Sequence, residues 1–147
     1  MFSKTCEYSI RATVYIYNRY LQNEGNVSID DIAEDIQSPR HFTAKILQTL
    51  SRQNIISSIK GPHGGFYLTE WQGKMSLLEL VRAIDGPRLL SGCVLGLEQC
   101  DELHPCPMHE QYKPLRDNLL ELLNANTIEN LAARLKKGQT FLNAFMQ

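Results

Sequence analysis

No run of apolar residues in this 147-residue chain approaches the ~18 residues that a transmembrane helix needs. Residues 1–9, MFSKTCEYS, also lack the apolar core of a signal peptide. Neither sign of charge is in excess, because 15 Lys and Arg stand against 16 Asp and Glu, for a net charge of −1. These absences exclude a membrane span and a uniformly basic coat, and they predict a soluble, cytoplasmic protein that does not contact membranes.

Motifs of catalysis are also missing. The sequence has no phosphate loop followed by Lys-Ser or Lys-Thr, no recognisable Ser/His/Asp arrangement and no motif of paired carboxylates. The chain is 43% hydrophobic and 21% charged, which is typical of a folded globular protein rather than a disordered one. The sequence therefore predicts a small folded protein that is not an enzyme.

Hydrophobic periodicity predicts three helices in the first third of the chain, over 7–21, 29–36 and 39–52. Ser28 is placed to cap the second helix, and Ser38 to cap the third, with Pro39 as its first residue.

A different pattern follows. Two short apolar stretches, 55–59 and 66–68, flank the glycine-rich turn 61–65 and predict a β-hairpin. Ser76 then opens a further helix that ends before Gly86-Pro87. Helix, turn, helix and hairpin in this order predict a winged helix-turn-helix over 1–87, in a mainly α protein with an α+β wing.

The rest of the chain divides into a loop and two helices. Residues 88–108 hold three cysteines without periodicity, and a loop of this length favours a function. Residues 109–147 are predicted to form a long dimerisation helix and a C-terminal helix capped by Thr127. The long helix carries an apolar stripe that would be buried against a second copy: Leu115, Leu119, Leu122 and Leu123.

Local charge predicts a DNA-binding surface. Residues 36–69 contain four Lys and Arg and no Asp or Glu, whereas the preceding helix is acidic, which suits a helix held away from the duplex. The alternatives are a solvated helix face and a protein-binding module. The residues predicted to bind DNA lie in the second helix of the motif, or just before it, and in the wing: Ser38, Arg40, His41, Thr43, Gln48, Lys60, His63 and Gly64.

Cys93, Cys100 and Cys106 fall within fourteen residues, which predicts a metal centre in a reducing cytosol. Their spacing differs from Cys-x2-Cys zinc knuckles, and soft thiolates also suit copper(I) or an iron–sulfur cluster. Buried inert thiols, a disulfide with one free thiol, and structural zinc are the alternatives. A cluster would need a fourth ligand, for which the sequence offers four residues: His109, His104, Cys6 and Glu7.

The sequence resembles the IscR/NsrR/CymR-type family of bacterial transcriptional regulators over nearly its whole length. The resemblance rests on Ser3-Lys-x-x-Glu-Tyr8, on Ser38-Pro39 with its following helix, and on Lys60-Gly-Pro-x-Gly-Gly65 before an aromatic residue. The three-cysteine loop before a long helix is more specific still. One departure is the first cysteine gap, which is six residues where the IscR-like branch usually has five.

The resemblance implies a homodimer that binds a pseudo-palindromic DNA operator and senses iron–sulfur or redox status. In the IscR-like branch it implies a 2Fe–2S cluster, in preference to 4Fe–4S, held by the three cysteines and His109. In the NsrR-like branch, which responds to nitric oxide, it implies Glu7 of the partner subunit as the fourth ligand. The CymR-like branch lacks the cysteine trio and implies a cluster-free regulator controlled by a partner protein.

Overall fold

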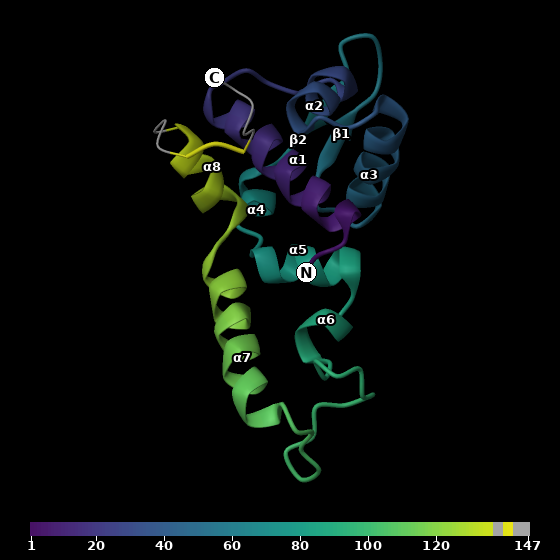
Figure 1. The fold of residues 1–147 in the computed structure, drawn as a ribbon. Coiled ribbons are helices and arrows are strands. Elements are labelled where there is room, and N and C mark those ends of the chain that lie inside the picture. Colours follow the sequence, from purple (N-terminus) through teal and green to yellow (C-terminus); the bar gives the residue numbers. More distant parts are fainter. Residues whose placement is uncertain (137–139, 143–147) are drawn as a thin grey trace.

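The computed structural model describes residues 1–136 and 140–142, which form a winged-helix unit with a helical arm (Figure 1). The first part of the chain folds as α1 (Lys4–Leu21), α2 (Ile29–Ile36), α3 (Arg40–Arg52), β1 (Ser57–Ile59) and β2 (Gly65–Tyr67). It is followed by α4 (Glu70–Gly73), α5 (Leu77–Asp85), α6 (Arg88–Ser91), α7 (His109–Ala125) and α8 (Ile128–Lys136). The predicted fold class is confirmed, while the one-turn helices α4 and α6 are additions to the prediction.

The helix boundaries follow from their capping residues. The Ser28 hydroxyl accepts a hydrogen bond from the Asp31 backbone N–H at the start of α2, as predicted. Ser76 and Glu79 form a complete capping box at the start of α5. Each satisfies backbone donors that the first turn of a helix would otherwise leave unpaired.

The prediction that Ser38 caps α3 is wrong. The N-cap residue is Pro39, without a side-chain hydrogen bond, and the helix begins at Arg40. Ser38 instead completes the end of α2: Gln37 adopts φ 54°, and the Ser38 N–H donates to the Ala33 carbonyl oxygen at 3.0 Å. This hydrogen bond is typical of a helix C-terminus and turns the Ser38 side chain toward the interior.

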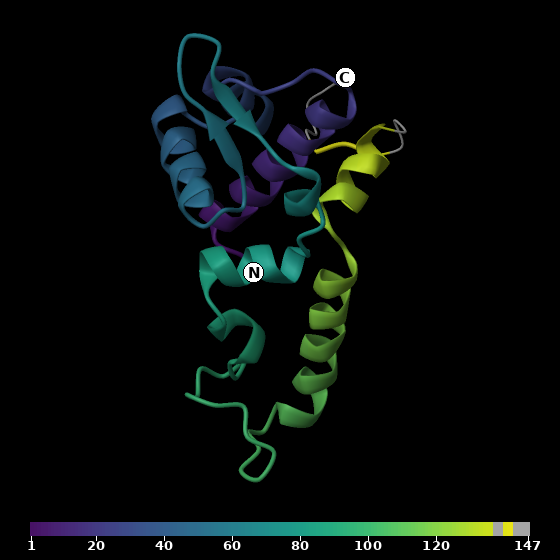
Figure 2. The ribbon, with the colours of Figure 1, turned by 180° about the vertical axis from the view of Figure 1, so that it is seen from behind.

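The main core surrounds α1. The helices α1, α2, α3, α5 and α8 supply large, fully buried side chains such as Ile16, Ile32, Leu47, Leu80 and Ile128. Ile55 and Ile56, before β1, and Leu68, after β2, are also fully buried in this core. The C-terminal helix α8 lies beside α1 in both views (Figures 1 and 2). The Asn18 side-chain amide donates to the Ala132 carbonyl oxygen at 3.2 Å. Residues 137–139 and 143–147 of the predicted C-terminal region lie outside the described residues.

The wing is an antiparallel pair in which Ser58 lies opposite Phe66. Val27, just before α2, extends this pair through two backbone hydrogen bonds with Phe66, at 2.7 and 2.8 Å. A Cβ at Gly65 would lie 2.6 Å from the Val27 carbonyl oxygen, so the close approach requires glycine. The wing is therefore fixed to the start of α2.

A second apolar cluster joins α7 to the winged-helix unit. It contains Cys6, Leu78, Val81, Leu90 and Leu123. The placement of Leu123 on a stripe facing a second copy is wrong, because Leu123 is buried within the protomer against α5. Leu115 and Leu122 remain exposed. From this cluster α7 runs to the cysteine loop, at the opposite end of the molecule from the wing tip (Figure 1).

None of the described helices has the length and apolar character needed to cross a membrane. The longest of them, α1, has 18 residues and carries charged arginine, lysine and glutamate side chains.

Candidate DNA interface and cysteine loop

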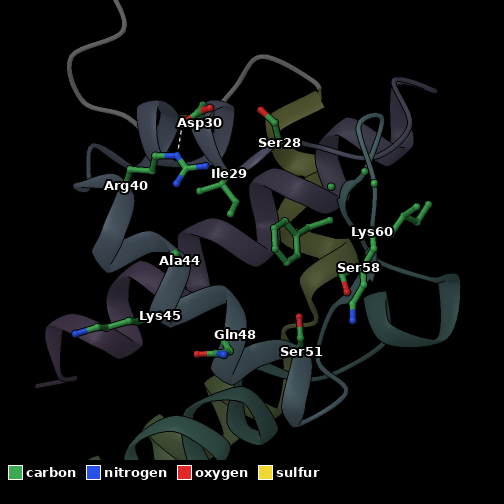
Figure 3. A pocket seen from close by; sticks show the side chains of 15 residues that line it. Ser28, Ile29, Asp30, Arg40, Ala44, Lys45, Gln48, Ser51, Ser58 and Lys60 are labelled. Atoms are coloured by element: carbon green, nitrogen blue, oxygen red, sulfur yellow. Dashed lines mark hydrogen bonds and ion pairs between the residues drawn. The ribbon is translucent and has the colours of Figure 1, made fainter.

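A cavity of about 640 Å³ lies between the start of α2, one face of α3 and the wing (Figure 3). Four of the residues predicted to bind DNA line it together: Arg40, Gln48, Lys60 and Gly64. Lys45 also lines it and is an addition to the residues predicted to bind DNA. Because Lys45 lies in the acid-free stretch, five residues after Arg40, its sequence position was a usable signal.

The predicted separation of the acidic helix from this surface is only partly right. Asp30, in the first turn of α2, lines the same cavity as Arg40. The Arg40 Nε donates to the Asp30 Oδ1 at 2.8 Å, and the two side chains are 66% and 74% exposed. A carboxylate therefore lies among the cations of this surface (Figure 3).

Thr43 does not lie on the exposed face of α3. Its side chain is fully buried, and its hydroxyl donates to the Pro39 carbonyl oxygen at 3.1 Å. The prediction that Thr43 lies outside the buried stripe is wrong, because one turn of helix brings it onto the same side as Ile46 and Leu47. Thr43 thus contributes to packing.

The remaining predicted residues differ in exposure. His41 is exposed on α3 but does not line the cavity. His63 is exposed at the wing tip, where its carbonyl oxygen accepts from the Asn26 side-chain amide at 2.9 Å. Ser38 is 8% exposed, and among the described residues its hydroxyl has no hydrogen-bond partner. DNA contacts by these three residues stay predictions.

The cysteine loop places Cys93 among hydrogen-bond donors. The Leu95 backbone N–H lowers the pKa of the Cys93 thiol most strongly, with further hydrogen bonds from Leu97, Cys106 and Gly96 acting in the same direction. Such donors favour the thiolate, which is the form that binds metals. Cys93 and Cys106 therefore lie close together at this end of the loop.

Cys100 forms a second pair with His109. The Cys100 Sγ lies 3.4 Å from the His109 Nδ1, and His109 is only 9% exposed at the start of α7. All four cysteines are free thiols. Within residues 1–136 and 140–142, no three His, Cys, Asp or Glu side chains lie close enough together to hold a metal ion. The predicted ligands are thus arranged as two pairs.

The other ligands considered lie elsewhere. Cys6 is fully buried in the second apolar cluster, where burial, helped by Asp85, raises its pKa to about 12. Glu7 is half-exposed and pairs with Lys4 at 3.0 Å. His104 is exposed and pairs through Nδ1 with Asp101 at 2.9 Å.

Two cationic side chains of α7 hold the loop in place. The Lys113 Nζ lies 3.5 Å from a Glu102 oxygen of the loop and 2.9 Å from an Asp117 oxygen. Arg116, whose side chain is 10% exposed, donates to the Gly92 carbonyl oxygen at 3.4 Å, directly before Cys93. The loop is therefore fastened to the helix that follows it.

A winged helix with basic residues gathered on α3 and the wing defines a DNA-binding transcriptional regulator. The chain matches the Rrf2 family model, described as an iron-dependent transcriptional regulator, over residues 2–134. The protein belongs to the Rrf2 family, and it is not an enzyme.

Individual relatives agree with this assignment. An HTH-type transcriptional regulator of Aquifex aeolicus is 28% identical over 133 residues, covering 89% of this chain and 90% of that protein. IscR of Xenorhabdus nematophila is 26% identical, over 74% of this chain and 65% of the relative's length. The structure of CymR, the global cysteine regulator of B. subtilis, superposes with a TM-score of 0.75 at 22% identity, over 90% of this chain and 96% of that one.

Proposed function

We propose that this protein is a cytoplasmic, homodimeric transcriptional regulator that binds an iron–sulfur cluster and senses iron–sulfur or redox status. The observation that carries the proposal is the loop of Cys93, Cys100 and Cys106 ending at His109, with Cys100 Sγ 3.4 Å from His109 Nδ1. Cluster ligands are thiolates whose properties are tuned by N–H donors to sulfur. Cys93 has such donors, so the donor chemistry of this loop fits a cluster.

The proposed ligands are Cys93, Cys100, Cys106 and His109, with 2Fe–2S preferred to 4Fe–4S. A bound cluster would supply a redox-active centre that is sensitive to oxygen and to nitric oxide. The chain's own part is to hold the loop: Arg116 binds the backbone before Cys93, and Lys113 binds Glu102. Arg116 and Lys113 both belong to α7, so a change in the conformation of the loop would alter its contacts with that helix.

The proposed partners are a pseudo-palindromic operator and a second copy of the chain. Two winged helices related by a two-fold axis read two half-sites about one helical turn, or a small multiple, apart. The exposed leucines of α7, Leu115 and Leu122, would lie in the dimer interface. DNA contacts are proposed for the cavity residues Arg40, Lys45, Gln48 and Lys60 and for the wing tip. Residues 1–87, 88–108 and 109–147 would then serve DNA binding, cluster binding and dimerisation, with α8 also packing on α1.

Anaerobic purification followed by a visible absorption spectrum and iron and sulfide assays tests the cluster. We expect Cys93→Ser, Cys100→Ser and Cys106→Ser to lose the spectrum and the iron. Cys6→Ser is the matched control, because Cys6 is buried away from the loop and should leave the spectrum unchanged. Retention of a full spectrum by all three loop variants would contradict the proposal.

The fourth ligand is tested in the same assay with His109→Ala, Glu7→Ala and, as a control, His104→Ala. Loss of the spectrum in His109→Ala alone supports the IscR-like arrangement. Loss in Glu7→Ala alone would instead support a ligand from the partner subunit and an NsrR-like, nitric-oxide-sensing repressor.

A second candidate is a cluster-free regulator controlled by a partner protein. The observation favouring it is that, among the described residues, no three His, Cys, Asp or Glu side chains lie close enough together to hold a metal ion. On this alternative, anaerobically purified protein contains no iron or sulfide, and the cysteine variants bind DNA like the wild type.

A further inference from the structure

Asp30 is an unexpected residue in a surface that binds DNA, because a carboxylate repels phosphate. The cavity is lined by three cationic side chains, Arg40, Lys45 and Lys60, and by Asp30 as its carboxylate. Of the three cations, Arg40 is the one that pairs with Asp30, through Nε at 2.8 Å. The carboxylate is thus directed at one arginine (Figure 3).

The geometry of this pair leaves the outer edge of Arg40 available. A guanidinium has five N–H donors in a rigid plane, one on Nε and four on the two η nitrogens. Asp30 takes the donor on Nε, so the η nitrogens remain for a bidentate contact with a guanine base. A planar group fixed at one edge also loses less conformational entropy when it binds.

Asp30 and Arg40 lie on different helices, and each lies in a first turn that the structure stabilises. Asp30 lies in the first turn of α2, which Ser28 caps. Arg40 is the first residue of α3, whose next turn is anchored by the buried Thr43. The pair therefore joins the two helices of the helix-turn-helix at the end of α3 that enters the major groove.

We propose that Asp30 is a positioning residue that determines DNA sequence specificity by orienting Arg40 for base contact and by disfavouring its use as a phosphate contact. This inference rests on the proposed role of Arg40 in reading a base. In the absence of Asp30, Arg40 would swing to the nearest phosphate, raising affinity for all sequences and lowering the preference for the right one.

The test uses the full-length protein and a library of randomised DNA duplexes. Sequences enriched by the wild type define the preferred site, and fluorescence anisotropy then measures the ratio of affinity for that site to affinity for random duplexes. Arg40→Ala should lower this ratio roughly 5- to 150-fold, the range for losing a bidentate contact. Asp30→Ala should lower it roughly 2- to 5-fold, in the range expected of one exposed ion pair, and should raise the affinity for random DNA.

Asp31→Ala is the matched control. Asp31 neighbours Asp30, lies in the same first turn of α2 and has the same charge, but it does not line the cavity. It should therefore change the net charge and the acidic charge of the first turn of α2 by the same amount, while leaving the ratio unchanged. Asp30→Asn, which keeps an oxygen acceptor for Arg40, should retain part of the preference.

Double substitution gives the decisive result. In the Arg40→Ala background, Asp30→Ala should cause no further fall in the ratio, because the residue it positions is gone. Equal effects of Asp30→Ala and Asp31→Ala, or a full Asp30 effect without Arg40, would overturn the inference. If Arg40→Ala itself leaves the ratio unchanged, the proposed reading role of Arg40 fails as well.

Discussion

The exposed leucines of α7 allow the proposed dimer interface to be tested with a calculable effect. Leu115 is 66% exposed and Leu122 is 59% exposed. Full burial of a leucine side chain stabilises by about 1.5–3 kcal/mol, so burying the exposed part of each contributes about 1–2 kcal/mol. A two-fold axis places each residue in the interface twice. Replacing either leucine by aspartate should therefore cost about 2–4 kcal/mol, roughly a 30- to 1,000-fold rise in the dimer dissociation constant.

Sedimentation velocity over a concentration series measures that constant, and circular dichroism checks that the variants fold. Leu103→Asp is the matched control, since Leu103 is also exposed but lies in the cysteine loop rather than on α7. An unchanged dissociation constant in both Leu115→Asp and Leu122→Asp would refute this assignment of the interface. A comparable loss in Leu103→Asp would show that the loop takes part as well.

Four further predictions concern the wing and the buried cysteine. Lys60→Ala should weaken binding to all DNA sequences alike and lower the salt slope by about one, as measured by anisotropy at several salt concentrations; an unchanged slope would exclude a phosphate contact. Gly64→Ala would place a Cβ 2.1 Å from the Ile59 carbonyl oxygen, so the wing must shift. The affinity for DNA should fall, while the α-helical circular dichroism signal should stay unchanged. Wild-type affinity would contradict this prediction. Because burial raises the pKa of Cys6 to about 12 from 9.0, its thiolate is scarce at pH 8, and mass spectrometry should find it alkylated by iodoacetamide far more slowly than Cys93. Between about pH 9 and 12 the folded state keeps a proton on Cys6 that the unfolded state releases, so the free energy of unfolding should fall as the pH rises. Urea denaturation should show a fall of at most about 1.4 kcal/mol per pH unit. Cys6→Ala should remove this fall.

The elements that the sequence predicted well are those determined by local signals. Ser28 and Ser76 cap their helices where expected, and the glycine-rich turn joins two short strands. These features depend on residues within a few positions of one another, so one sequence is enough to find them. Ser38 has the same residue type but is not a cap, because α3 begins one residue later than expected, at Arg40, and Pro39 occupies the N-cap position.

Features that depend on which helix faces which could not be predicted in this way. Periodicity placed Leu123 on the apolar face of α7, but it cannot show that α5 covers this residue while Leu115 and Leu122 stay exposed. Thr43 failed for a related reason: a polar residue can lie in a buried stripe when its hydroxyl finds a backbone carbonyl one turn earlier.

The net charge of residues 36–69 also differs from the net charge of the residues that line the cavity. The stretch 36–69 carries +4, counting Arg40, Lys45, Arg52 and Lys60. The cavity excludes Arg52 and includes Asp30 from the preceding helix, so three cations and one anion leave +2 around it. The lower positive charge would weaken the attraction for any phosphate, while Arg40, in the proposed role, would keep its η nitrogens for a base. If both proposals hold, this surface would bind DNA in general more weakly and discriminate between sequences more strongly, which suits a regulator that must find one site in a genome.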